Sequence, residues 1–208
     1  NDGGVYKTDN PQSKLWTDIS NGLGITQFYR NAVSDIASFQ IAGSQDNGTK
    51  GRDASGVWDE LTGGDGMNCE MDYVDSNTFY TAIQRGELRR TTNRGNNFKD
   101  IQNTIPGRPQ GAWITPYVIS PHNNQQLVAG YEKVWYSPDR GDSWTAVTPT
   151  NVTGTRDARR LAMTADSSGT IYALYENSGL VYYTHGFVPG DTISLDTLEV
   201  PYSGTMSD

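Results

Sequence analysis

Two short, glycine-flanked stretches hold the densest group of oxygen and amide side chains in the sequence. They read "SQDNGT" and "TGGDGMN", and they supply Gln45, Asp46, Asn47, Asp65 and Asn68. Carboxylate and amide oxygens are the ligands that Ca²⁺ takes, roughly six to eight at a time, which is more than these side chains alone supply. The same groups could instead hydrogen-bond a polar ligand, or close the turns in which they stand, because Asn-Gly and Asp-Gly are strong turn formers.

The elements that must position these residues form an internal repeat. Four segments share a polar turn followed by a short apolar alternation, and the small residues Ala42, Ala82, Ala129 and Ala173 recur at intervals of 40, 47 and 44 positions. The apolar period is two, which excludes helical repeats of this length. A repeat of roughly 40–47 residues with four short strands is typical of a β-propeller blade. We therefore predict an all-β fold built from four-stranded antiparallel blades.

The repeat assigns the whole chain to one β-propeller domain. Residues 1–20 are expected to form the outer half of a blade, and successive blades occupy 21–62, 63–103, 104–149 and 150–208. An open arc leaves sheet faces exposed to water. We therefore expect an incomplete arc of about four and a half blades, whose remainder belongs to a larger propeller chain.

The order of strands within a blade places the oxygen-rich stretches on one face of the propeller. If strands A to D run outward from the axis, the B–C and D–A loops share one face, and the A–B and C–D loops share the other. Both stretches then lie on the first face, to which other loops add Trp113, Tyr131, Glu132, Arg159 and Glu176. Three interpretations stay open for this face: plain turns, a Ca²⁺ site, or a surface that binds a protein or a glycan.

A second motif recurs in the turns of the opposite face. In "YSPDRGDSWTAV" it comprises Ser137, Asp139, Gly141 and Trp144, and "TTNRGNNF" repeats it with Thr91, Asn93, Gly95 and Phe98. The pattern resembles the Asp-box of bacterial neuraminidase-type (BNR) repeats. A short carboxylate or amide within a turn can accept backbone N–H groups, and glycine supplies a positive φ. We interpret both copies as structural braces and assign them no catalytic role.

The loops "QDNGT" and "GGDGM" resemble paired loops of secreted bacterial propellers with sortilin-like or neuraminidase-type repeats. This resemblance implies a secreted or cell-surface protein. A sialidase would need an arginine cluster, and Arg30, Arg159 and Arg160 are present without the Arg-Ile-Pro signature of that family. A xyloglucanase-type hydrolase would need two opposed carboxylates, for which Asp46 and Asp65 are the candidates. A third resemblance, to the photosystem-II stability factor, would require a basic patch.

Composition narrows the class of partner. The 208 residues carry a net charge of −8, whereas a nucleic-acid-binding surface needs an excess of Lys and Arg. No apolar run approaches the roughly 20 residues that cross a bilayer, and Cys69 is the only cysteine. We hypothesise a non-enzymatic extracellular binding or scaffold propeller, with no cofactor unless Ca²⁺ binds. The alternative is a carbohydrate-active hydrolase whose catalytic residues lie partly outside this segment.

Overall fold

The computed structural model describes residues 4–22, 24, 26–146, 161–166, 170–177, 180–187 and 194–200. All strand pairs within these ranges are antiparallel. The helical elements there are short 3-10 turns, namely η1 (Pro11–Ser13), η2 (Gln84–Gly86) and η3 (Gln102–Thr104). No helix in the described ranges is long and apolar enough to cross a membrane.

Four four-stranded sheets, here called sheets 1 to 4, follow one another along the chain. Sheet 1 holds β3 (Phe28–Val33), β4 (Gln40–Ser44), β5 (Gly48–Arg52) and β6 (Trp58–Thr62). Sheet 2 holds β7 (Gly66–Met71), β8 (Phe79–Ile83), β9 (Glu87–Thr91) and β10 (Lys99–Asp100). Sheet 3 holds β11 (Tyr117–Ile119), β12 (Leu127–Gly130), β13 (Val134–Ser137) and β14 (Thr145–Ala146). Sheet 4 holds β15 (Leu161–Ala165), β16 (Thr170–Asn177), β17 (Leu180–Phe187) and β18 (Ser194–Val200).

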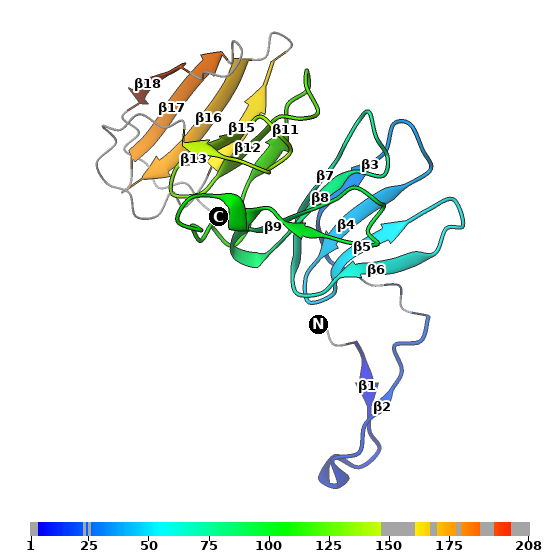
Figure 1. Ribbon diagram of the computed structural model, residues 1–208. Coiled ribbons are helices and arrows are strands. Elements are labelled where there is room, and N and C mark those ends of the chain that lie inside the picture. The colour runs from blue at the N-terminus through cyan, green and yellow to red at the C-terminus, as the bar shows by residue number, and fades with distance from the viewer. Residues whose placement is uncertain are drawn as a thin grey trace.

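The sheets are arranged as an open arc, with sheet 1 at one end and sheet 4 at the other (Figure 1). Strands stand in chain order across each sheet, and the first strands of neighbouring sheets contact one another. The prediction of an incomplete all-β propeller with four-stranded antiparallel blades is confirmed. A further two-stranded sheet, the β1–β2 hairpin, pairs β1 (Tyr6–Lys7) with β2 (Thr17–Asp18) and lies apart at the bottom of Figure 1.

Apolar side chains between neighbouring sheets make the core. Between sheets 1 and 2, Phe39 and Ile41 pack with Cys69, Met71 and Phe79. A larger cluster lies between sheets 2 and 3 and includes Tyr80, Leu88, Ile101, Tyr117, Leu127 and Trp144. Strand β7 has a sheet on either side, so both of its faces are covered. This explains why "GMNCEM" is buried almost throughout instead of alternating between buried and exposed residues.

Candidate functional site

The two oxygen-rich stretches meet at one end of sheets 1 and 2. Residues 45–47 turn from β4 to β5, and residues 63–65 link β6 to β7. The backbone N–H of Asp46 donates a hydrogen bond of 2.8 Å to the Oδ1 atom of Asp65. The fold thus brings together Asp46 and Asp65, which stand in different loops. This end of sheets 1 and 2 is here called the rim.

Glycines permit this close approach of the two loops. The Gly48 N–H donates to the Gly64 carbonyl over 2.8 Å. A Cβ atom on Gly66 would lie only 2.1 Å from the Gly48 carbonyl oxygen, which no other residue type could accommodate without moving the backbone. The glycines of "DNG" and "GGDG" therefore set the distance between the loops as well as their turns.

The carboxylate of Asp65 accepts a hydrogen bond from a backbone N–H group. Asp65 receives the Asp46 amide, as expected of a side chain that braces a loop. Among the described residues no three His, Cys, Asp or Glu side chains are grouped so as to hold a metal ion. The bond between the two residues joins the Asp65 carboxylate to the backbone N–H of Asp46, so it is a contact that holds two loops together.

Tyr29 of β3 connects the rim to an exposed tryptophan. Its hydroxyl donates to Gln45 Oε1 over 3.1 Å and accepts the indole N–H of Trp113 over 3.3 Å. Trp113 is 47% exposed, and it stands in the long link from β10 to β11. Residues from sheet 1 and from the link between sheets 2 and 3 are thereby joined across the rim.

A second set of hydrogen bonds connects the rim to Trp113 through the turn from β8 to β9. Together with the bonds of Tyr29 to Gln45 and Trp113, it forms what is here called the rim circuit. The Asp65 N–H donates to Gln84 Oε1 over 3.1 Å. The next residue, Arg85, donates its N–H to the Trp113 carbonyl over 3.2 Å and accepts the Gly111 N–H over 2.9 Å. Because hydrogen bonds fix the aromatic and amide groups from several loops, the rim is a preorganised surface.

A polar cavity of about 550 Å³ opens beside this circuit. It lies between the β8–β9 turn and the link from β10 to β11, and its wall includes Gln84, Arg85, Glu87, Asp100, Gln102, Arg108, Gln110 and Trp113. The Gln102 amide donates to the Pro109 carbonyl over 2.8 Å and so ties the link to η3. The cavity falls within the size range of ligand sites, roughly 300–1,000 Å³, and its wall is mainly polar.

Only some of the charged side chains around the cavity form ion pairs with described residues. Glu87 and Asp100 both lie beside Arg89, at 3.5 and 3.0 Å. Arg85 and Arg108 are exposed and have positive φ angles of 64° and 46°. Neither of their guanidinium groups pairs with a described residue. The cavity therefore offers hydrogen-bond donors to a ligand.

Several residues predicted for this face do not reach the rim surface. Asn68 is buried in β7, where its amide donates to the Tyr117 carbonyl over 3.1 Å. Tyr131 is also buried and donates its hydroxyl hydrogen to the Gly86 carbonyl over 2.6 Å. Glu132 is half-buried next to it, while the Asn47 amide is exposed and donates to the Gln45 carbonyl over 2.9 Å.

Two further residues predicted for this face cannot be located on it. Arg159 lies outside the described residues, as does Arg160 of the sialidase hypothesis, and for Glu176 the structure describes only the backbone of β16. The residues that the fold brings together are therefore Gln45, Asp46, Asp65 and Trp113.

Sequence reasoning missed Tyr29, Gln84, Arg85 and Arg108. A usable signal existed for one of them, because Gln84 directly follows strand β8 as Gln45 directly follows the last residue of β4. Comparing repeats position by position would have found Gln84 on the same face. Nothing in the sequence near Tyr29 or Arg108 indicates that these residues lie beside Trp113 or the cavity.

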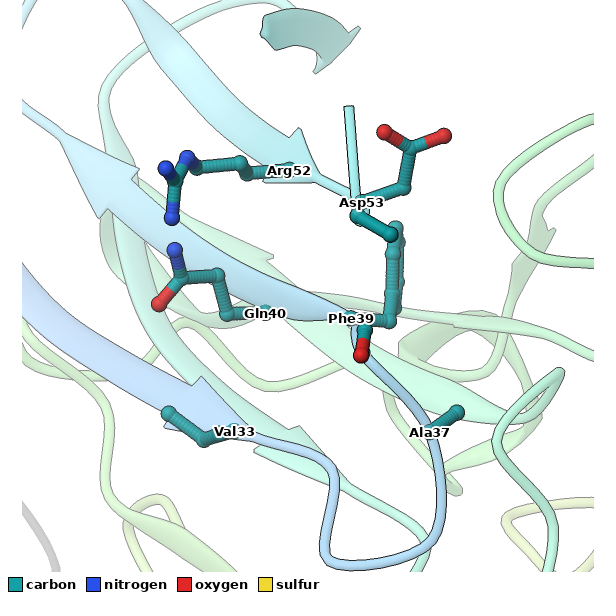
Figure 2. A pocket seen from close by; sticks show the side chains of 8 residues that line it. Val33, Ala37, Phe39, Gln40, Arg52 and Asp53 are labelled. Carbon is teal, nitrogen blue, oxygen red and sulfur yellow. The ribbon is translucent and has the colours of Figure 1, made fainter. Parts of the chain in front are cut away.

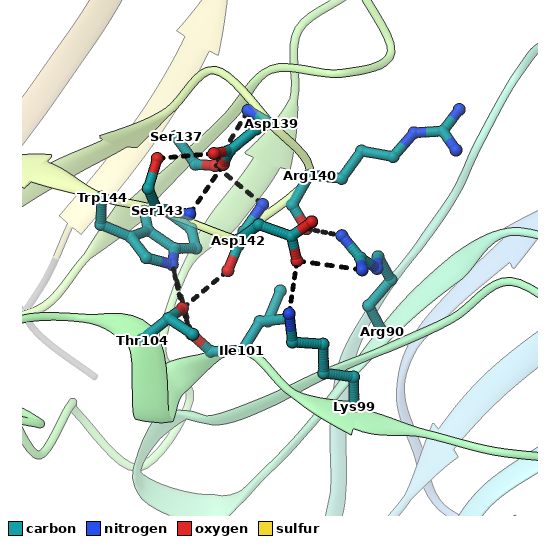
Figure 3. A network of polar contacts seen from close by, with 11 residues as sticks. Arg90, Lys99, Ile101, Thr104, Ser137, Asp139, Arg140, Asp142, Ser143 and Trp144 are labelled. Carbon is teal, nitrogen blue, oxygen red and sulfur yellow. Dashed lines mark hydrogen bonds and ion pairs between the residues drawn. The ribbon is translucent and has the colours of Figure 1, made fainter.

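The Asp-box-like turn of sheet 3 is closed by its own side chains (Figure 3). Ser137 Oγ accepts the Gly141 N–H over 2.7 Å, and Asp139 Oδ1 accepts the Ser143 N–H over 2.8 Å. Partial burial raises the pKa of Asp139, but hydrogen bonds from Ser143 and Ser137 outweigh it and hold that pKa below its usual value. Trp144 is buried and donates its indole N–H to the Ile101 carbonyl over 3.2 Å.

The equivalent turn of sheet 2 uses an amide in place of the carboxylate. Thr91 Oγ1 accepts the Gly95 N–H over 3.0 Å, and Asn93 Oδ1 accepts the Asn97 N–H over 2.9 Å. Phe98 is half-buried, with its ring edge-on to Phe79 at 5.9 Å between centroids. In both turns the polar side chains are engaged within the turn, which agrees with a structural role.

A smaller cavity of about 260 Å³ lies at the opposite end of sheet 1 (Figure 2). Its lining includes Phe39, Gln40, Arg52 and Asp53, and in Figure 2 the Gln40 and Arg52 side chains point toward one another. Arg52 donates to the Gly56 carbonyl over 3.0 Å, while Asp53 accepts the N–H of Ser55 within the same turn. We therefore treat this cavity as part of the turn.

Comparison with solved structures shows the β-propeller fold. The Dos1 propeller has a TM-score of 0.60 at 11% identity, and the match covers 96% of this chain and 51% of that one. YCF48 bound to D1 peptide has a TM-score of 0.52 at 16% identity, covering 86% and 55%. YCF48 from Cyanidioschyzon merolae has a TM-score of 0.50 at 15% identity, covering 94% and 65%.

This chain therefore spans about half to two thirds of the length of those structures. No protein-family model matches the sequence, and no curated protein matches it. What fold and site define together is a β-propeller with a preorganised, polar rim.

Proposed function

We propose that this chain is a non-enzymatic binding propeller whose ligand is a protein segment. The rim circuit and the adjoining cavity form the site. A bound peptide would meet the half-exposed indole of Trp113 on one side and the donors of Arg85, Arg108 and Gln110 on the other. Amide and guanidinium groups of this kind hydrogen-bond the carbonyl and carboxylate groups of a peptide.

The observation that carries the proposal is the fixation of Trp113. Its indole N–H is bonded to Tyr29 and its carbonyl to the Arg85 N–H, yet nearly half of its surface faces solvent beside a cavity of about 550 Å³. Exposed tryptophans held in place at the edge of a pocket are typical anchors of protein interfaces. The structure of YCF48 with a D1 peptide supports this reading, since that propeller binds a peptide.

The wider setting of this function is also a proposal. The turns of sheets 2 and 3 carry the side-chain pattern of neuraminidase-type Asp-boxes, and similar propellers with sortilin-like repeats are secreted. We therefore propose that the chain belongs to a larger exported protein and acts at the cell surface. A glycan is the alternative ligand class, because carbohydrate also stacks on an exposed tryptophan.

A peptide-display selection against the immobilised chain tests the proposal. Selected peptides are resynthesised, and their affinity is measured by calorimetry for the native chain and for Trp113→Ala. We expect saturable binding that Trp113→Ala weakens by roughly 10-fold or more. Val33→Ala is the control, because Val33 is 58% exposed and ends β3 at the opposite end of the sheet from the rim. Equal losses in both variants, or no saturable peptide at all, would contradict the proposal.

A further inference from the structure

The outer strands of one sheet pack against the last turn of the next sheet in a repeated way. Leu61, near the end of β6, lies so close to the β9–β10 turn that a Cβ on Gly95 would be 3.0 Å from Leu61 Cδ2. Ile101, directly after β10, lies against the β13–β14 turn, where a Cβ on Gly141 would be 2.6 Å from Ile101 Cδ1. An apolar residue of each outer strand therefore covers a glycine of the following turn.

A common position in the sequence defines this apolar residue. Leu61 comes three residues after Trp58, and Ile101 comes three residues after Phe98. In the β1–β2 hairpin, Ile19 comes three residues after Trp16. The same spacing thus marks Ile19 as the residue that should cover a turn of sheet 1.

The hydrogen bonds of the hairpin support this equivalence. Directly after the last ladder pair of β1 and β2, the Ile19 N–H donates to the Val5 carbonyl over 2.9 Å. Directly after the last ladder pair of β9 and β10, the Ile101 N–H donates to the Leu88 carbonyl over 3.0 Å. The β1–β2 hairpin is therefore built like the outer half of sheet 2.

The two hairpins differ in what covers them. Leu88 and Ile101 are almost fully buried, whereas Val5 and Ile19 are 44% and 46% exposed. Trp16 is exposed as well. The hairpin thus presents to solvent the same apolar positions that sheet 2 buries against sheet 3, which costs free energy in proportion to the apolar area left in water.

Sheet 1 has a matching uncovered surface. Its turn between β5 and β6 contains Gly56, with a φ of 80°, and the three atoms nearest to a Cβ there would all belong to the Arg52 side chain. Trp58 is exposed and contacts Phe28, which is also exposed, at 5.6 Å between ring centroids. Among the described residues, no apolar side chain stands as close to Gly56 as Leu61 does to Gly95 or Ile101 to Gly141.

We propose that the β1–β2 hairpin seats on this surface of sheet 1, with Ile19 against the Gly56 turn and Trp58. The inference is independent of the ligand proposed above. Residues 20–27, which link the hairpin to β3, span up to roughly 26 Å when extended, enough to let the hairpin fold back. The seated hairpin would hold this link beside the rim, where Gln45 already donates its N–H to the Gln27 carbonyl over 3.1 Å.

Cysteine cross-linking tests whether the β1–β2 hairpin seats on sheet 1. The cysteine pair stands at the positions that correspond to a contact between β10 and the β13–β14 turn. The Lys99 Nζ atom lies 2.6 Å from Asp142 Oδ1, between β10 and the residue after Gly141. Thr17 follows Trp16 as Lys99 follows Phe98 and, counted from the turn glycines, Val57 follows Gly56 as Asp142 follows Gly141. The test variant is therefore Thr17→Cys with Val57→Cys, and the positive control is Lys99→Cys with Asp142→Cys. All four sites are exposed, so the substitutions should not disturb folding.

The native thiol will not interfere with the reaction. Cys69 is buried, and burial raises its pKa to about 12, so almost no thiolate is available to a short bismaleimide at neutral pH. Intramolecular products are identified by their mobility as monomers and by mass spectrometry of the linked peptides. The experiment is run in dilute solution, where links between molecules are slow.

We expect the Thr17–Val57 pair to cross-link within one molecule at a yield within about twofold of the positive control, and Ile19→Asp to lower that yield severalfold. Thr17→Cys with Val74→Cys, an equally exposed site beyond sheet 1, should give little product. The proposal is overturned if the test pair stays unlinked while the positive control reacts. It is also overturned if the product is only intermolecular, or if Ile19→Asp leaves the yield unchanged.

Discussion

The Nη2 atom of Arg140 lies 3.2 Å from the Oδ2 atom of Asp72, a carboxylate of sheet 2 that is completely buried. Arg140 stands in the Asp-box-like turn of sheet 3 with a positive φ of 60°, and this conformation turns it toward the neighbouring sheet. The same carboxylate accepts two backbone N–H groups, from Val74 and Asp75, and the side-chain amide of Asn124. Asp72 is thus a buried junction between two blades.

We predict that Asp72→Ala lowers the free energy of unfolding by about 3–5 kcal/mol, because it leaves a partly buried guanidinium and several donors without their acceptor. Chemical denaturation followed by far-UV circular dichroism measures the change. Asp59→Ala, at an exposed site in β6, is the matched control and should stay within about 0.5 kcal/mol of the native chain. Equal effects of the two variants would show that the junction contributes nothing.

The turn of sheet 3 should tolerate an amide better than a methyl group. Asp139→Ala removes the acceptor for the Ser143 N–H and is expected to cost about 1–3 kcal/mol. Asp139→Asn should cost less than about 1 kcal/mol, because the side-chain oxygen of Asn93 accepts the equivalent backbone N–H in the turn of sheet 2. Thermal denaturation ranks the two variants, and equal losses for Asp139→Asn and Asp139→Ala would show that the negative charge, and not the acceptor oxygen, matters at this position.

Glu70 of β7 should make stability fall as the pH rises. Burial raises its pKa from 4.5 to about 7, with partial relief from the positive charge of Arg30. Because the folded chain holds the proton more tightly, stability declines between pH 4.5 and about 7 and levels off above that range. Glu70→Gln should abolish this decline and stabilise the chain at pH 8 by about 1–3 kcal/mol. Urea denaturation at pH 4.5 and 8 provides the comparison.

Calcium should leave the rim unchanged. Since Asp65 already accepts the Asp46 N–H, its carboxylate serves the loop without a cation. We expect the melting temperature to be the same, within about 1 °C, in millimolar Ca²⁺ and in a chelator. A rise in Ca²⁺ that Asp65→Asn removes would instead establish a calcium site at this rim.

Local patterns were predictable, and contacts between distant segments were not. The spacing of Ser137, Asp139 and Gly141 describes one turn, so its hydrogen bonds follow from a few adjacent residues. The blade pattern likewise follows from alternation within short strands. By contrast, the bond between Trp113 and Tyr29 joins residues 84 positions apart, and neither stands in a recognisable motif.

Asn68 shows a second limit. It is three residues from Asp65 in a polar loop sequence, which suggested a shared face. The strand begins at Gly66, however, and β7 packs between two sheets, so a polar side chain there is buried whichever way it points. The Tyr117 carbonyl satisfies its amide, and only the neighbouring sheet could have revealed that acceptor.

The arginines of the two Asp-box-like turns make the blades non-interchangeable. Arg140 pairs with the buried carboxylate of Asp72, whereas Arg94 at the same place in sheet 2 lies over the ring of Phe39, 5.1 Å from its centroid. If sheets 2 and 3 exchanged places, Asp72 would lose its guanidinium and Arg140 would meet an aromatic ring. Sheets 2 and 3 are thus each matched to the blade before them, and these two repeats encode their own order around the axis.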